Sequence, residues 1–251
     1  ALDPSLTVYL EYSNEVWNSQ FQQTQYAQAE GLALGLHSSP WHAGWLYYSQ
    51  RSVEVFEVFS NSYNQPHDRN LVRVLAGQSV NPWVNNQIMD WQDAYKHADA
   101  FAVAPYFGGY LGNLTISPNT ASFSIPYLLN ACDYNSANNH TQHTLPNYTN
   151  ASIRGLKLLA YEGGQHLVGV GAAQNNLTLT NLFIAANRDP LMRTLYYDDL
   201  TRWEANGGGL FMNYTLTGDS TRYGSWGLVE WQGQPRSTAP KWLGLMDYLG
   251  Y

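Results

Sequence analysis

YLEYSNE, residues 9–15, is an apolar run of strand type that ends in the pair Asn14-Glu15. LLAYEGG, residues 158–164, repeats the arrangement, with Glu162 followed by two glycines. Each carboxylate stands where a buried strand is expected to stop. In a parallel α/β barrel the carboxyl ends of all strands face one mouth, so carboxylates that are far apart in sequence can meet there. The two stretches therefore predict parallel strands of an α/β fold whose carboxyl ends lie together.

The rest of the chain alternates between strand and helix patterns, which is typical of a parallel sheet. Five strands are expected, at residues 7–11, 71–76, 100–104, 157–161 and 210–213. Helices are expected at residues 21–36, 49–63, 82–97, 190–206 and 240–249. The polar stretch 113–150 reads as exposed loop, so the sequence predicts no core element there.

The Asn-Glu and Glu-Gly-Gly strand ends resemble clan A of the glycoside hydrolases, which are retaining (β/α)8-barrel enzymes. In that clan an Asn-Glu pair ends strand four, its Glu being the acid/base, and a nucleophilic Glu ends strand seven. Asn14-Glu15 and Glu162 match these positions in residue type, order and strand context. The resemblance implies hydrolysis of a β-linked polysaccharide or oligosaccharide without a cofactor or metal, with Glu162 attacking and Glu15 transferring protons.

The same resemblance implies three substrate-binding residues. Asn14 would hydrogen-bond the sugar 2-hydroxyl, an interaction that strengthens in the transition state. Tyr106 follows the third visible strand and matches a tyrosine that hydrogen-bonds the nucleophile, although an ordinary strand-end aromatic is the alternative. Trp226 follows the last strand and matches the floor of the sugar subsite that is cleaved. The clan's arginine on strand two has no counterpart in this sequence.

Five strands are fewer than the eight of a barrel. If Glu15 ends strand four, residues 1–251 are a partial barrel domain, and five strands leave edges exposed. We therefore expect the strand ending at Glu11 to present an edge that is unpaired or is paired by another chain. An upstream segment or a second chain would complete the barrel, and the abrupt start, Ala1-Leu2-Asp3-Pro4, favours truncation.

Length and composition are in accord with one domain. The chain has 251 residues, 44% hydrophobic, which is within the range of a single α/β barrel. A net charge of −7 argues against nucleic acid or an anionic membrane as partner. No apolar run is long enough to span a membrane. Nine Trp and nineteen Tyr supply flat faces on which sugars can stack, although most are expected in the core.

The cysteine content and the sequons bear on the cellular location and covalent modification of the protein. Cys132 is the only cysteine, so an internal disulfide and a cysteine-rich metal site are excluded. Proteins that digest polysaccharides are usually exported, which favours an extracellular glycoprotein. Asn-x-Ser/Thr sequons occur at Asn113, Asn139, Asn147, Asn150, Asn176 and Asn213.

Two other functional hypotheses remain open. One is a catalytically inactive barrel that binds carbohydrate, and the other is an α/β protein in which both Glu motifs are structural. The separation of the Glu15 and Glu162 carboxyl groups distinguishes them, because a retaining pair requires about 5–5.5 Å. His140 and His143 are metal-ligand candidates, but a polar surface loop explains them better. Asp198, Asp199 and Glu204 are most simply solvated charges on a helix.

Overall fold

The computed structural model describes residue 3, residues 5–63 and residues 70–251, so Ala1, Leu2 and Pro4 of the abrupt start lie outside the described residues. The chain forms two compact units. Unit 1 comprises Ala1–Ala104 and Leu145–Tyr161, and unit 2 comprises Pro105–Thr144 and Glu162–Tyr251. Because a compact unit need not be an independent domain, the single catalytic domain expected from sequence stays a prediction.

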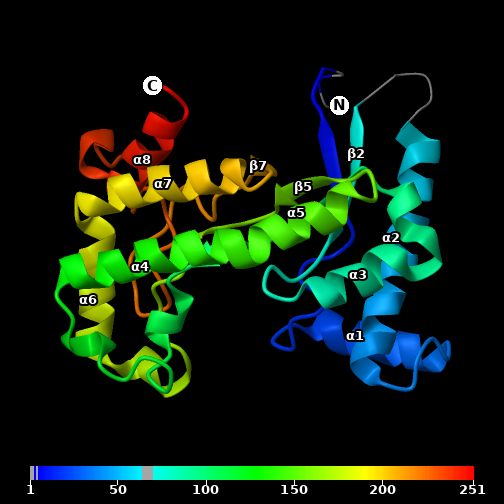
Figure 1. Ribbon diagram of the computed structural model, residues 1–251, viewed down its shortest axis with the longest axis horizontal. Helices are drawn as coiled ribbons and strands as arrows, with labels where there is room; N and C mark the ends of the chain where they lie inside the picture. Colours follow the sequence, from blue (N-terminus) through cyan, green and yellow to red (C-terminus); the bar gives the residue numbers. More distant parts are fainter. Residues whose placement is uncertain (1–2, 4, 64–69) are drawn as a thin grey trace. The chain divides into compact units, whose positions relative to one another are not determined.

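Unit 1 is built on four parallel strands in the order β1-β2-β3-β5. They are β1 (Val8–Glu11), β2 (Leu71–Ala76), β3 (Ala100–Val103) and β5 (Lys157–Ala160), of which Figure 1 labels β2 and β5. All four residues of β3 are buried, which is the pattern of a parallel strand covered on both faces. The prediction of an α/β protein with a parallel sheet is confirmed.

The sheet of unit 1 has an open edge at β1. Within the described residues β1 pairs with β2 alone, in a register that places Leu10 opposite Arg73. The prediction of an edge at the strand ending in Glu11 is confirmed. The described strands of this unit do not close into a barrel, so the partial (β/α)8 barrel stays a prediction.

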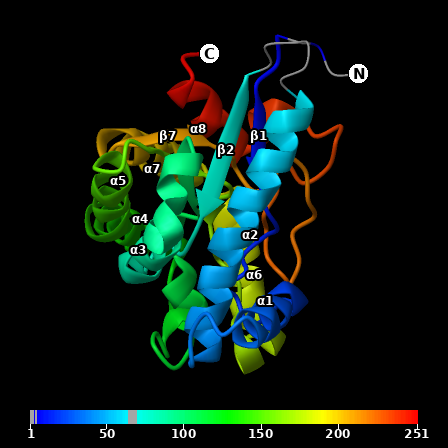
Figure 2. The same ribbon diagram turned by 90° about the vertical axis from the view of Figure 1, so that its right-hand side faces the viewer.

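Helices of unit 1 connect these strands (Figure 2). They are α1 (Gln22–Ala33), α2 (Pro40–Tyr63), α3 (Pro82–Asp90), the 3₁₀ segment η1 (Trp91–His97) and α5 (Leu145–Ser152). The Asn81 side chain caps α3 by accepting from the Val84 amide at 3.4 Å. Helix α2 begins at Pro40, nine residues before the predicted start, because proline suits a first helical turn. Gly31 of α1 permits close packing on α2, since a Cβ there would lie 2.2 Å from the Ala43 carbonyl oxygen.

Unit 2 is mainly helical. Its helices are α4 (Ile125–Asn139), a π-helical turn (His140–Thr144), α6 (Leu177–Arg188), α7 (Leu191–Ala205) and α8 (Pro240–Tyr248). Its strands are β4 (Tyr106–Phe107), β6 (Gly164–Gln165) and β7 (Gly208–Phe211), of which β4 and β6 pair in parallel. Figure 1 shows α4 and α7 side by side, and the two helices contribute Leu128, Leu129, Cys132, Met192 and Leu195 to one buried apolar cluster.

The prediction that residues 113–150 form an exposed loop is wrong. This stretch contains α4, the π-helical turn and most of α5, and Ser124 caps α4 by accepting from the Tyr127 amide. Asn147 lies in it and is only 1% exposed, with its amide bonded to Asn85 and to the Ser79 carbonyl. A glycan has no room at Asn147. The stretch misleads because several of its polar side chains point into the protein.

Candidate functional site

Glu15 is held firmly within unit 1. It lies four residues beyond β1 in a turn where it has φ 45° and Ser13 has φ 60°. Its half-buried carboxylate accepts a hydrogen bond from the Tyr161 hydroxyl on Oε1 at 2.8 Å and from Asn18 Nδ2 on Oε2 at 2.7 Å. Non-glycine residues with left-handed backbone cost about 1–2 kcal/mol each, and such conformations collect at functional sites. The turn therefore places and orients one carboxylate at the carboxyl end of the sheet.

Aromatic rings pack next to this turn. Trp17 is 7% exposed, with its ring 6.1 Å from that of Tyr48 and 6.2 Å from that of Tyr161. The Tyr48 hydroxyl is buried and accepts from the Ala76 amide at 2.9 Å, and burial raises the pKa of that phenol. Asn14 has an exposed side chain, while its carbonyl accepts from the Gln23 amide at 2.6 Å. The predicted Asn14-Glu15 pair is therefore accessible at Asn14 and fixed at Glu15.

Glu162 opens the second part of unit 2, and packing explains the two glycines that follow it. A Cβ at Gly163 would lie 2.5 Å from the Phe211 ring of β7. Gly164 has φ +126°, and a Cβ there would lie 3.0 Å from the Tyr196 hydroxyl. Both positions therefore require glycine. Gly164 pairs with Tyr106 across β4 and β6, which brings Tyr106 beside the segment that carries Glu162.

An aromatic cluster lies next to this segment in unit 2. The rings of Tyr106, His166 and Trp226 lie 5.1–5.9 Å apart, each pair meeting edge to face. Tyr214 adds its ring 6.0 Å from Trp226, and its amide donates to the Gly163 carbonyl at 2.9 Å. The structure thus brings together Tyr106 and Trp226, the two predicted substrate-binding residues of this unit. The sequence did not predict His166 and Tyr214 as site residues, because the only indication was that each lies shortly after a strand end.

The loop that carries Trp226 is anchored by buried polar groups. The Ser225 carbonyl accepts from Gln165 Nε2 at 2.8 Å and from the Lys241 ammonium. Lys241 is 5% exposed, and burial lowers its pKa to about 7, although the charge of Glu230 opposes the shift. The indole nitrogen of Trp226 itself donates to the Tyr223 carbonyl at 2.8 Å. Its ring is therefore held in place before any ligand arrives.

Asn213 is a half-buried polar residue beside Gly164. Its Nδ2 is buried and has no hydrogen-bond partner among the residues that the structure describes. Its Oδ1 lies 3.2 Å from the position that a Cβ would take on Gly164. A buried donor without a partner costs about 1–3 kcal/mol, so it is a feature expected of a site that binds a polar ligand.

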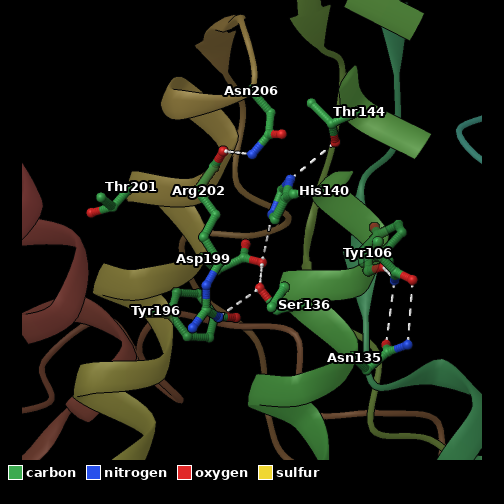
Figure 3. Close-up of polar contacts among 12 residues, drawn as sticks. Tyr106, Asn135, Ser136, His140, Thr144, Tyr196, Asp199, Thr201, Arg202 and Asn206 are labelled. Carbon is green, nitrogen blue, oxygen red and sulfur yellow. Dashed lines mark hydrogen bonds and ion pairs between the residues drawn. The ribbon is translucent and has the colours of Figure 1, made fainter. Parts of the chain in front are cut away.

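His140 and Asp199 were predicted to be exposed on the surface, but they belong to a buried hydrogen-bond network (Figure 3). They are 1% and 2% exposed, and His140 Nε2 lies 3.0 Å from Asp199 Oδ1. Ser136 donates to the same carboxylate oxygen at 2.7 Å, and Thr144 pairs with His140 Nδ1 at 3.0 Å. The prediction of a polar surface loop at His140 and of a solvated Asp199 is wrong. In the described part of the chain, no three His, Cys, Asp or Glu side chains form a group that could hold a metal ion.

The predicted residues thus fall into two groups. Asn14 and Glu15 belong to unit 1, whereas Glu162, Tyr106 and Trp226 belong to unit 2. The separation of the two carboxyl groups stays a prediction. The chain matches no family model, and no curated protein or solved structure matches it. Within the described ranges, none of the helices has the length and hydropathy needed to cross a bilayer.

Proposed function

We propose that the protein is a retaining glycoside hydrolase that acts on a β-linked polysaccharide or oligosaccharide and that its strands are part of a (β/α)8 barrel. One observation carries the proposal. The Tyr161 hydroxyl donates to Glu15 Oε1 at 2.8 Å, and the next residue in the chain is Glu162. Tyr161 thus orients the expected acid/base, and the expected nucleophile is its neighbour in the chain.

The two carboxylates divide the reaction between them. Glu162 attacks the anomeric carbon while the glycosidic bond breaks, and Glu15 gives its proton to the departing oxygen. The product of this step is a glycosyl ester on Glu162. Glu15 then takes a proton from water, whose oxygen attacks the same carbon and releases Glu162. Two inversions restore the configuration of the starting glycoside, and no cofactor takes part.

The surrounding residues fit the binding of a sugar. Trp226, held by its anchored loop, offers a flat ring against the C–H face of a pyranose. Asn14 supplies an exposed amide for the 2-hydroxyl, and Asn213 supplies a buried donor without a protein partner in the described chain. Since a polymer is digested where it lies, we further propose that the enzyme works outside the cell.

The test begins with a screen of aryl β-glycosides and of β-glucans, mannans, xylans and galactans. On an aryl glycoside that the wild type cleaves, Glu162→Ala should lose turnover, and azide should restore part of it as the α-glycosyl azide. Glu15→Ala should retain the first step, because an activated leaving group needs little protonation, and should give the β-glycosyl azide.

A matched control is Glu57→Ala, which removes an exposed carboxylate from α2 and should leave turnover unchanged. Opposite anomers from the two variants would assign the two roles independently. Normal turnover in Glu162→Ala would refute the proposal. A folded wild type that binds polysaccharide but cleaves none would favour the inactive carbohydrate-binding protein instead.

A further inference from the structure

Unit 1 contains a group of four packed rings outside the proposed reaction site. This ring cluster consists of His37, His42, Trp45 and Trp83. The His37 and His42 imidazoles stack with centroids 4.1 Å apart. His42 then contacts both indoles, at 5.7 Å from Trp45 and 5.6 Å from Trp83, and the two indoles lie 5.7 Å apart at 82°. The rings come from the loop after α1, from the start of α2 and from the start of α3.

The cluster presents both a flat apolar face and hydrogen-bond donors. Trp83 is 54% exposed, so a large part of this apolar side chain is open to a ligand. His37 is exposed, and its Nδ1 accepts from the Ser39 amide at 2.9 Å, so its Nε2 carries the ring proton and can donate it to a hydrogen bond. His42 Nε2 lies 3.1 Å from Gln87 Oε1, which accepts a hydrogen bond from it. Burial and the neighbouring His37 lower the pKa of His42, so the stacked pair does not carry two charges at neutral pH.

Topology places the cluster at the carboxyl end of the parallel strands. Helix α3 is the next element after β2, and α2 is the element before β2. The first turns of both helices therefore lie at the end of the sheet where the parallel strands have their carboxyl ends. Figure 2 shows α2 running antiparallel to β2, with its first turn on the side of the β2 arrowhead. Glu15 follows the carboxyl end of β1 in the same unit. A sugar chain bound at Glu15 therefore has an aromatic surface available at the same end of the sheet.

We propose that the ring cluster is a second sugar-binding site, which holds a pyranose unit of the polysaccharide apart from the bond that is cleaved. Trp83 stacks on the C–H face of the sugar, and His37 Nε2 donates to a hydroxyl. None of the four side chains bears a permanent charge, which suits a neutral glycan better than a phosphate or an acidic peptide. The inference rests on the proposed function for the identity of the polymer and implies action within long chains.

Affinity electrophoresis tests the site without requiring hydrolysis. The wild type, Trp83→Ala and His37→Ala are run through gels that contain β-glucan, mannan, xylan or galactan. The wild type should be retarded by one of these, and each variant should bind that polymer on the order of tenfold more weakly, the loss of one stacked or hydrogen-bonded contact. Trp41→Ala is the matched control, because Trp41 is 43% exposed in the same turn of α2 and has no ring contact with the cluster among the described residues.

The outcomes separate this inference from the proposed function. Weaker retardation of both variants, with an unchanged rate on a short aryl glycoside, supports the site. Equal retardation of Trp83→Ala and the wild type overturns it, as does a wild type that no polymer retards. A wild type that is retarded through Trp83 but cleaves nothing supports the site and refutes the hydrolase.

Discussion

Replacing Lys241 with Met should alter how the stability of the protein depends on pH. Lys241 lies in the first turn of α8, is 5% exposed, and donates from its ammonium to the Ser225 carbonyl. Burial lowers its pKa from 10.5 to about 7. Methionine has a similar length and no charge, and in the variant the Ser225 carbonyl keeps its hydrogen bond from Gln165 at 2.8 Å. The substitution therefore removes a titrating group with little change in packing.

The sign and size of the effect follow from linkage. Between pH 7 and 10.5 the unfolded chain holds a proton on Lys241 that the folded chain has released. The free energy of unfolding of the wild type therefore rises with pH in this window, by about 1.4 kcal/mol per pH unit from this group. The Met variant lacks that contribution. From pH 7 to 9.5 the wild type should gain roughly 3 kcal/mol relative to the variant.

The measurement is urea unfolding of both proteins, followed by tryptophan fluorescence at several pH values from 6 to 9.5. Other groups cancel in the comparison, including Cys132, whose pKa burial raises to about 12. Below pH 7 the difference between the two proteins should stop changing, because Lys241 is then protonated in both states of the wild type. A difference that stays constant from pH 6 to 9.5 would refute the reasoning and place the ammonium in contact with water.

Two further substitutions probe the other polar contacts. Tyr161→Phe removes the hydroxyl that orients Glu15 and should lower turnover of an aryl glycoside roughly tenfold without loss of stability, so wild-type turnover in a folded variant would contradict the role given to Tyr161. His140→Ala removes the imidazole that is hydrogen-bonded to the buried Asp199 carboxylate and should reduce the free energy of unfolding by roughly 1.5–3 kcal/mol; a loss below about 0.5 kcal/mol in urea titration would contradict the buried pairing.

The strands could be predicted from the sequence because the buried strands consist of apolar residues. The run 100–104 is apolar throughout, and β3 (Ala100–Val103) is fully buried. Strand β7 was predicted two residues late, since Gly207-Gly208-Gly209 read as a helix stop. In the structure Gly208 belongs to the strand, and a Cβ there would lie 2.0 Å from the Trp203 ring. The glycine serves packing there, which no local pattern reveals.

The helices of residues 113–150 were missed for a physical reason. Pattern reading treats a polar residue as exposed, but Ser136, His140 and Asn147 are each at most 1% exposed and bond to partners far away in sequence. Those partners lie about 60 residues away along the chain. Burial of this kind is decided by tertiary hydrogen bonds, so it leaves no periodic signal.

The sequence predicted the site residues that follow strand ends. It did not predict the residues that contact them from distant parts of the chain. Glu15 and Glu162 follow apolar runs, which sequence shows directly. The contact of Tyr161 with Glu15 spans 146 residues, and the packing of His166 on Trp226 joins two loops. These contacts join residues that are far apart in the sequence, so neither the partner of Glu15 nor the ring beside Trp226 could be predicted.

The interleaving of the two units has a consequence for biosynthesis. Unit 1 is complete only when β5 has emerged, but the ribosome must first produce Pro105–Thr144, which belongs to unit 2. At about 5–20 residues per second, that segment alone delays β5 by roughly 2–8 s. Until then β3 has its neighbour β2 on one side and an open backbone edge on the other. Open edges recruit foreign strands, so the nascent chain is most exposed to aggregation during those seconds of translation.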